Sequence, residues 1–225
     1  MSEESRYGGD DVPVLMRGAP VEHYAERRRL ASALNRLASQ IVRIDAGADD
    51  LARWADAAEA IAAEAGQHAR RDEKAGHRRM WHGEASLLDI WDLFDFDSVS
   101  GESNAIAPGL RFAQDLPTVV ASVNCGLAYQ GPPGCVHGGV IAWIFDALLS
   151  RVQHVNGLFG MTGGLSIRYL APTPIETELR GEAEVQRMEG RKAFITGRLL
   201  ADGKVTAEAE GVFILPKPKA EGSPA

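Results

Sequence analysis

A single carboxylate stands inside an otherwise apolar run of this 225-residue chain. The run covers residues 140–149, contains Asp146, and directly follows His137, Gly138 and Gly139. Burying a carboxylate is costly, so an acid in such a run indicates a chemical role. Bare N–H groups at a helix start suit an anion or a polarised carbonyl oxygen, and glycine lets a ligand approach them closely. The run therefore predicts an oxyanion donor and an acid or base on one helix.

The spacing on this helix, predicted over residues 137–153, separates the two groups. Gly139 and Asp146 point to nearly the same face, but they lie roughly 10 Å apart along the helix axis. An oxyanion donor and a base must both come within about 3 Å of the reacting group. One helix cannot supply both, whereas an antiparallel second copy could place its Asp146 beside the first copy's glycines. This geometry predicts a two-fold dimer with two equivalent sites.

The same stretch resembles the PaaI-type, THEM-like branch of the hotdog-fold acyl-CoA thioesterases. In that family His-Gly-Gly is followed by an acid nine positions after the histidine, which here is Asp146. The similarity continues in residues 160–174, 189–192 and 207–213, so it covers about residues 98 to 215. An ordered set of motifs is more specific than His-Gly-Gly alone.

The resemblance implies a role for each residue of the motif. Asp146 would act as a general base toward water, or as a nucleophile that forms a mixed anhydride, and both remain open. The N–H of Gly138, or of Gly139, would hold the oxyanion, with Gly138 preferred. His137 would shape the turn. Thr162 would hydrogen-bond the catalytic water or acid, or would be an ordinary hydroxyl at the start of a strand.

Substrate binding is assigned to five polar residues, which are Asn104, Gln130, Arg168, Arg191 and Lys192. Asn104 lies in the loop that approaches the acyl pocket in similar proteins, although it also suits a turn. Gln130 stands at the position where similar proteins have a polar residue that lines the site. Arg191 and Lys192 flank a hairpin and could clamp the phosphates of coenzyme A, or could be solvated.

The fold that the pattern predicts is α+β. Strands are predicted over residues 109–114, 118–129, 161–170, 177–188, 192–200 and 204–215, with Glu189-Gly190 and Asp202-Gly203 as hairpin turns. Long antiparallel strands need a face to bury against, and the apolar helix is the partner available. We therefore expect a hotdog fold, in which a curved antiparallel sheet wraps around a long central helix.

Apolar residues recur at helical spacing in two segments near the N-terminus, over residues 20–45 and from Leu51. They are Leu30, Leu34, Leu37, Ile41 and Ile44 in the first, and Trp54, Ala58, Ile61, Ala62 and Ala65 in the second. These segments predict an N-terminal helical hairpin outside the family resemblance, which we interpret as a packing appendage or an oligomer contact. Residues 87–97 fit a helix or an extended segment.

Four regions follow from these assignments. They are a flexible N-terminus (1–19), the helical hairpin appendage (20–82), the hotdog thioesterase domain (83–215) and a disordered tail (216–225).

Composition excludes several classes of function. The chain has 45% hydrophobic residues, 24% charged residues and a net charge of −7, values that suit a globular protein and argue against nucleic-acid binding. No apolar run reaches the ~18 residues of a membrane span, and the acidic N-terminus lacks a signal-peptide core, so a cytoplasmic location is expected. His68, His77 and His82 lack the ligand spacing of a metal site. Cys135 lies near His137, but no third group is evident to orient a Cys–His nucleophile.

Together these observations predict a homodimer, or a dimer of dimers, that hydrolyses fatty or aryl acyl-CoA to the free acid and coenzyme A in fatty acid metabolism. No metal or redox cofactor is expected, because coenzyme A is part of the substrate. The alternatives are a non-catalytic acyl-CoA-binding hotdog module and a hotdog hydratase or dehydratase acting on acyl thioesters. Neither the acyl length nor the preference between coenzyme A and a carrier-protein thioester follows from the sequence.

Overall fold

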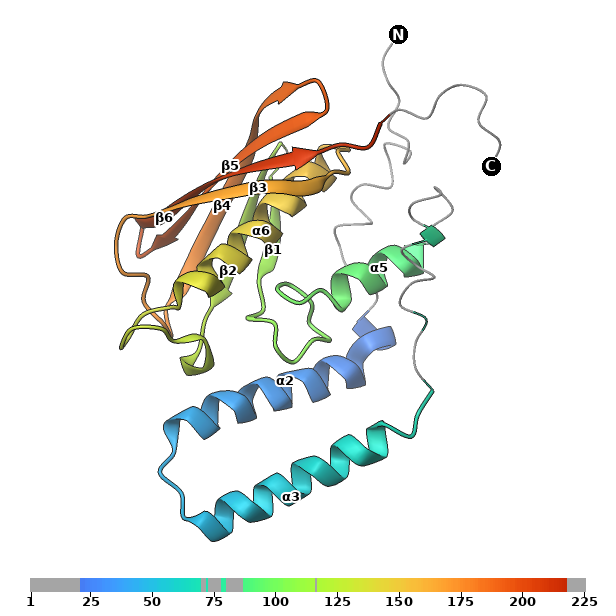
Figure 1. The fold of residues 1–225 in the computed structure, drawn as a ribbon, viewed down its shortest axis with the longest axis vertical. Helices are drawn as coiled ribbons and strands as arrows, with labels where there is room; N and C mark the ends of the chain where they lie inside the picture. The colour runs from blue at the N-terminus through green and yellow to red at the C-terminus, as the bar shows by residue number, and fades with distance from the viewer. Residues whose placement is uncertain (1–20, 70–71, 73–77, 80–86, 116, 218–225) are drawn as a thin grey trace.

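One helix lies against one face of an antiparallel sheet in the computed structural model, which describes residues 21–69, 72, 78–79, 87–115 and 117–217. The helix is α6, Gly138–Val155. The sheet has the order β1-β2-β4-β5-β6-β3 and wraps around α6 (Figure 1). Its strands are β1 Arg111–Asp115, β2 Thr118–Asn124, β3 Met161–Tyr169, β4 Glu178–Glu189, β5 Lys192–Ala201 and β6 Lys204–Ile214. The predicted hotdog fold is confirmed.

The packing of α6 depends on small residues in the sheet below it. Ile144, Phe145, Leu148 and Leu149 are fully buried against alternate residues of β4, β5 and β6. A Cβ on Gly211 would lie 2.9 Å from Leu149 Cδ1, and one on Gly197 would lie 3.0 Å from Leu149 Cδ2. Glycine at these two strand positions therefore lets Leu149 rest directly on the sheet.

The second strand is shorter than the sequence pattern predicts. Instead of continuing through residue 129, β2 ends at Asn124, and a 3₁₀ turn, η1, follows over Leu127–Tyr129. Its backbone bonds run from Tyr129 N to the carbonyl of Gly126 and from Gln130 N to the carbonyl of Leu127. These local bonds take the chain off the sheet and toward the start of α6. The other strand predictions agree with the structure to within two residues.

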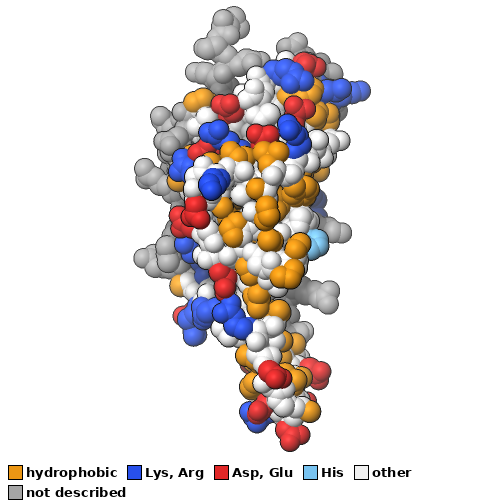
Figure 2. Space-filling view, turned by 90° about the vertical axis from the view of Figure 1, so that its left-hand side faces the viewer, with side chains coloured by type: hydrophobic (Ala, Val, Ile, Leu, Met, Phe, Trp, Pro, Cys, Tyr) orange, Lys and Arg blue, Asp and Glu red, His pale blue; other side chains and the backbone are white. Residues whose placement is uncertain are grey.

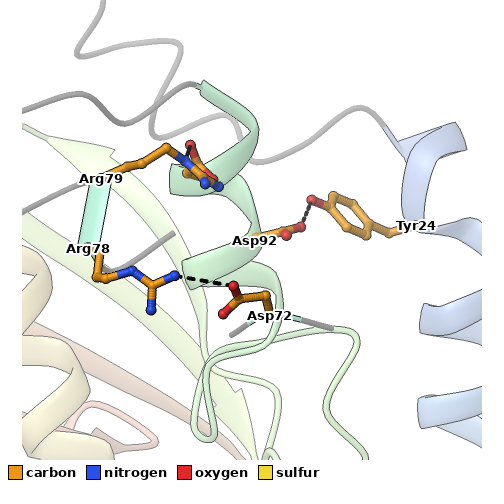
Figure 3. A network of polar contacts seen from close by, with 6 residues as sticks. Tyr24, Asp72, Arg78, Arg79 and Asp92 are labelled. Atoms are coloured by element: carbon orange, nitrogen blue, oxygen red, sulfur yellow. Dashed lines mark hydrogen bonds and ion pairs between the residues drawn. The ribbon is translucent and has the colours of Figure 1, made fainter. Parts of the chain in front are cut away.

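Residues 87–97 fitted either a helix or an extended segment, and the structure shows a helix there, α5, Leu87–Asp95. Figure 3 shows the polar contacts that surround it: Tyr24 of α2 donates a hydrogen bond to Asp92, and Arg79 pairs with Asp89. A neighbouring ion pair joins Arg78 and Asp72 at 3.2 Å. The acidic positions of α5 therefore bind arginine and tyrosine side chains from other segments.

Two helices precede α5: α2, Val21–Arg43, and α3, Ala48–Ala65. Both form where the sequence predicts them, and they run side by side at one end of the molecule (Figure 1). Leu30, Leu34 and Leu37 are 55%, 42% and 44% exposed, so no described residue covers this leucine stripe, and the interpretation of the hairpin as a packing appendage or an oligomer contact stays a prediction. The periodicity identified the helix but not the side that contacts the domain.

The contact face of α2 is mostly polar. Arg28 pairs with the buried Asp95 at 2.6 Å. The Asn35 amide donates to the carbonyl oxygens of Ala105 and Ala107 at 3.0 and 3.1 Å and to Tyr129 Oη at 2.7 Å. Specific hydrogen bonds, together with burial of Tyr24 and Ala31, thus attach α2 to the rest of the domain.

The predicted flexible N-terminus, 1–19, and nearly all of the predicted tail lie outside the described residues, and the four domain boundaries stay predictions. Within the described part of the chain, no helix combines the length and apolarity that a membrane crossing requires.

Aromatic rings enclose two basic side chains at the C-terminal end of α6. The Arg151 guanidinium carbon lies 4.1 Å from the ring centroid of Phe94 and 4.4 Å from that of Phe112. The His154 ring stacks on Phe159 at 5.3 Å, and its buried Nδ1 has no hydrogen-bond partner among the described residues. Burial, together with the nearby charge of Arg151, lowers the pKa of His154 to about 4.

This lowered pKa predicts a loss of stability in acid. In the unfolded chain the histidine pKa is about 6.5, so the unfolded state takes up the proton first as the pH falls. The free energy of unfolding should therefore decrease from about pH 6.5 to about pH 4, by at most about 1.4 kcal/mol per pH unit. Urea denaturation at several pH values gives the free energy of unfolding as a function of pH. This dependence on pH should be weaker in His154→Phe than in the wild type and unchanged in His68→Phe, which alters an exposed histidine. An equal dependence in all three proteins would contradict the assignment.

Candidate active site

The start of α6 leaves one backbone amide free. His137 is the N-cap, and its Nδ1 accepts a hydrogen bond from Gly139 N at 3.0 Å. The His137 carbonyl accepts from Val140 N at 2.9 Å and from Ile141 N at 3.1 Å. Of the first four helical amides, only that of Gly138 has no hydrogen-bond partner among the described residues. The geometry thus favours Gly138 over Gly139 as a donor to a ligand.

This cap also defines the histidine tautomer. Because Nδ1 accepts a hydrogen bond, Nε2 carries the proton of the neutral ring. His137 therefore has the geometry that its expected role in shaping the turn requires.

The turn before α6 is held by hydrogen bonds from both sides. Gln130 Oε1 accepts from Gly134 N at 2.8 Å, and Gly134 has a positive φ of 75°. His137 N donates to the Tyr129 carbonyl at 2.9 Å. A Cβ on Gly131 would lie 2.8 Å from His137 Cα, so the chain passes very close to itself here. The Gln130 side chain is thus already engaged within the turn.

Tyr169, which the sequence analysis did not select, contacts the same peptide group from β3. Its hydroxyl donates to the Gly138 carbonyl at 2.9 Å. The peptide between Gly138 and Gly139 is therefore held at its carbonyl by Tyr169 and at its N–H by His137. No local spacing signals this contact, because the tyrosine lies 31 residues from Gly138.

Asp146 and Thr162 do lie together, as the family resemblance implied. Thr162 Oγ1 donates to Asp146 Oδ1 at 2.9 Å. Asp146 is partly exposed rather than buried, which corrects the expectation drawn from its apolar neighbours. Ile144, Phe145 and Leu148 face the sheet, whereas Asp146 lies on the side of α6 that the sheet does not cover.

The structure keeps Gly138 and Asp146 apart within one chain. Eight residues of α helix separate them by about 12 Å along the axis. The strand beside Asp146, β3, is an edge strand whose outer side pairs with no strand among the described residues. Met161 and Tyr169 on this strand are 68% and 55% exposed.

The hairpin that carries Arg191 and Lys192 lies at the same end of the sheet as Thr162. Lys192 pairs with Ile214, which in turn pairs with Met161, the neighbour of Thr162. Two strand spacings therefore put the backbone of Lys192 about 10 Å from this end of β3. Arg191 Nη1 donates to the Leu215 carbonyl at 2.8 Å.

Two other candidate residues, Asn104 and Arg168, do not contact Asp146. Asn104 donates to the Phe96 carbonyl and accepts from Ile106 N, both at 3.2 Å, as a turn residue does. Arg168 lies 3.7 Å from Glu208 on the sheet face that points away from α6.

The outer face of the sheet carries an open groove of about 730 Å³. Its charged lining residues are Arg168, Arg180, Arg198, Glu182, Glu184, Glu208 and Glu210. Hydrogen bonds from Arg180 and Arg198 lower the pKa of Glu182. Because this groove and Asp146 lie on opposite faces of the sheet, the groove is not part of the candidate active site.

Other nucleophile and metal arrangements gain no support from the described residues. Cys125 is buried, which raises the pKa of its thiol to about 12, and Cys135 makes no hydrogen bond with His137. In the part of the chain that the structure describes, no three His, Cys, Asp or Glu side chains gather as metal ligands. His77 and His82 lie outside that part.

Comparison with known proteins identifies the family. Residues 133–208 match the family model described as the thioesterase superfamily. A crystal structure of a thioesterase superfamily protein is 32% identical, covers 84% of this chain and 94% of its own, and superposes with a TM-score of 0.72. The chain therefore belongs to the thioesterase superfamily.

Within that family the similarity extends to two named relatives. The acyl-coenzyme A thioesterase THEM4 of Rattus norvegicus is 34% identical over 98 residues, which are 43% of this chain and 42% of the relative. The acyl-coenzyme A thioesterase THEM5 of Homo sapiens is 28% identical over 93 residues, 40% of this chain and 37% of the relative. The chain spans less than half the length of these curated relatives. The THEM-like resemblance is confirmed.

The cap at His137 predicts a measurable contribution to stability. His137→Ala removes the acceptor for Gly139 N and should lower the free energy of unfolding by about 1 kcal/mol. His137→Asn, which also caps helices well, should retain most of it. Urea denaturation of the three proteins tests this, and equal stability of the alanine and wild-type proteins would exclude the capping role.

Proposed function

We propose that the chain is an acyl-CoA thioesterase that hydrolyses a fatty or aryl acyl-CoA to the free acid and coenzyme A. The observation that carries the proposal is the amide of Gly138, which no described residue binds, at the start of the helix that presents Asp146. Membership of the thioesterase superfamily supports this reaction class, and the names of the THEM4 and THEM5 relatives support the substrate class. A role in fatty acid metabolism and a cytoplasmic location stay predictions from the sequence.

The proposed enzyme is a homodimer, because the two groups are too far apart in one chain. Antiparallel pairing of β3 with β3 of a second copy would extend the sheet and place the two α6 helices side by side. Each Asp146 would then approach the partner's helix start. The unpaired edge of β3 and its exposed Met161 and Tyr169 support this contact.

The proposed reaction begins when Gly138 N–H binds the thioester carbonyl oxygen and stabilises the negative charge that develops there. Asp146 of the partner subunit takes a proton from water, whose oxygen attacks the carbonyl carbon. The C–S bond then breaks, and the coenzyme A sulfur leaves as a thiolate and is protonated. In the alternative route Asp146 attacks directly, and water hydrolyses the resulting mixed anhydride. Thr162 would hold the carboxylate in one orientation, and neither route uses a metal or redox cofactor.

The phosphates of coenzyme A are proposed to bind the hairpin of Arg191 and Lys192. Both side chains are cationic, and the hairpin lies at the Thr162 end of the sheet. Arg191 donates one N–H to Leu215, which fixes the guanidinium while leaving other donors for phosphate.

Replacing the acid tests the reaction. Asp146→Asn should lower kcat by roughly 100-fold or more, since an amide cannot serve as base or nucleophile, while the far-UV circular dichroism stays unchanged. Thiol release should be measured with short, long and aromatic acyl-CoAs. Glu184→Gln is the matched control, because it neutralises an exposed carboxylate on the opposite face of the sheet.

Two outcomes would contradict the proposal. Tight acyl-CoA binding by the wild-type protein without thiol release would indicate a binding module. Unchanged turnover in Asp146→Asn would remove Asp146 from the mechanism.

Tyr169 is predicted to be a positioning residue that acts through the Gly138 peptide. Tyr169→Phe keeps the ring but loses one hydrogen bond, of about 1 kcal/mol, so kcat should fall roughly 3- to 10-fold with KM unchanged. Ser166→Ala on the same strand points away from α6 and should leave kcat unchanged. An increase in KM alone, or an equal loss in both variants, would refute this role.

A further inference from the structure

The helix α2 meets the rest of the domain along one side. Figure 1 shows it below the loops that lead into α6, and Figure 2 shows the α2–α3 end as a narrow extension of the molecule. Arg28, Asn35 and Arg43 each bond to a different loop of the domain. The helix thus reaches several loops around the start of α6.

An asparagine in the interior of α2 makes the most specific of these contacts. Asparagine is a weaker helix former than alanine or leucine, because its short amide competes for backbone hydrogen bonds. Asn35 Nδ2 nonetheless lies 2.7 Å from Tyr129 Oη and 3.0 and 3.1 Å from the carbonyl oxygens of Ala105 and Ala107. Acceptors from two separate segments therefore converge on one amide group.

The hydroxyl of Tyr129 is held in both directions. It accepts the hydrogen bond from Asn35, and it donates one to the Ile106 carbonyl at 3.1 Å. A phenol that is bound as acceptor and as donor has one orientation, and its ring restricts the backbone of its own residue. The contact with α2 is thus passed to the backbone of η1.

The backbone of Tyr129 leads directly to the start of α6. Its carbonyl accepts a hydrogen bond from His137 N at 2.9 Å, and His137 Nδ1 accepts one from Gly139 N at 3.0 Å. Only Tyr129 and His137 therefore stand between Asn35 and the peptide group that follows Gly138.

The end of α2 supports the same turn from its other flank. Arg43 pairs with Glu176, which has a positive φ of 54°. The neighbouring Ile175 donates its N–H to the carbonyl of Gly134 at 3.1 Å, within the turn that precedes α6. Because the Arg43–Glu176 pair is exposed and such pairs contribute little, Asn35 provides the stronger attachment.

We propose that Asn35 is a positioning residue for the thioester hydrolysis proposed above. Through Tyr129 and His137 it holds the start of α6 in the orientation that directs the Gly138 N–H at the substrate carbonyl. The inference rests on that proposed function. An oxyanion donor acts only within about 3 Å of the developing charge, and a displacement of about 1 Å can lower the rate roughly 100-fold. A helix outside the sheet thus contributes to catalysis without contacting the substrate.

Removal of the amide donor tests this role. Asn35→Leu is similar in size and favours the helix, so α2 should stay helical. We expect kcat for thiol release to fall roughly 3- to 10-fold with KM unchanged, as the loss of one hydrogen bond implies. Tyr129→Phe should lose as much, and the double variant no more than either single variant, because both changes break the same connection. An unchanged kcat in Asn35→Leu, or losses that multiply in the double variant, would overturn the proposal.

Arg28→Met is the matched control on the same helix. Arg28 pairs with the buried Asp95 at 2.6 Å and with Glu102 at 2.9 Å, so its loss weakens the attachment of α2 but leaves Tyr129 bound. Urea denaturation should show lower stability in both Arg28→Met and Asn35→Leu, whereas kcat should fall only in Asn35→Leu. An equal fall in kcat in the two variants would assign the effect to general loss of attachment and would overturn the proposal.

Hydrogen exchange of residues 129–140 provides a readout that does not depend on turnover. The His137 amide, which binds the Tyr129 carbonyl, should exchange faster in Asn35→Leu and in Tyr129→Phe and at the wild-type rate in Arg28→Met. A wild-type protein that releases no thiol would contradict the proposed function. In that case, faster exchange in Asn35→Leu but not in Arg28→Met would still support the positioning of the helix start by Asn35, and unchanged exchange would overturn it.

Discussion

The hydrogen bonding of the first turn of α6 determines what this molecule can do. A helix start has four amides without regular helical acceptors, and here three of them are satisfied: His137 N binds the Tyr129 carbonyl, and Gly139 N and Val140 N bind the ring and the carbonyl of His137. The fourth, on Gly138, remains available at the positive end of the helix dipole. Had all four been satisfied, the helix would be a packing element only. The fold therefore concentrates its capacity to polarise a carbonyl in one N–H group.

Support for this turn reaches back to the appended hairpin. Tyr129 accepts a hydrogen bond from His137 N at its carbonyl, and its hydroxyl accepts one from Asn35 of α2. Burial raises the pKa of Tyr129, so its hydroxyl stays protonated and can donate to the Ile106 carbonyl. One tyrosine thus connects α2, the loop before β1 and the helix start. A helix outside the hotdog fold contributes in this way to the stability of the candidate site.

Local patterns in the sequence predicted most of the fold. Strand alternation and the turns at Gly190 and Gly203, both with positive φ, located the hairpins, and the apolar run located α6. The alternation of side chains along β3 could also have placed Arg168. Leu165 and Ile167 pack on the core, so Arg168 has to point to the outer face of the sheet. Contacts between distant residues could not be predicted. The Tyr169 bond to Gly138 depends on how β3 crosses α6, and the exposure of Asp146 depends on the rotation of that helix.

The contact of Leu149 with Gly197 and Gly211 has a consequence for substrate selectivity in the proposed enzyme. Because this side chain touches the strands directly, α6 can neither move closer to the sheet nor rotate about its own axis. The packing at this point leaves no room for a ligand between the helix and the sheet. In the proposed dimer, the hydrocarbon tail of an acyl thioester would extend along the uncovered flank of the helix, where the neighbouring subunit would form the opposite wall. The length and shape of the accepted tail would then depend on both subunits, and substitutions at the interface could change them without disturbing the core of either subunit.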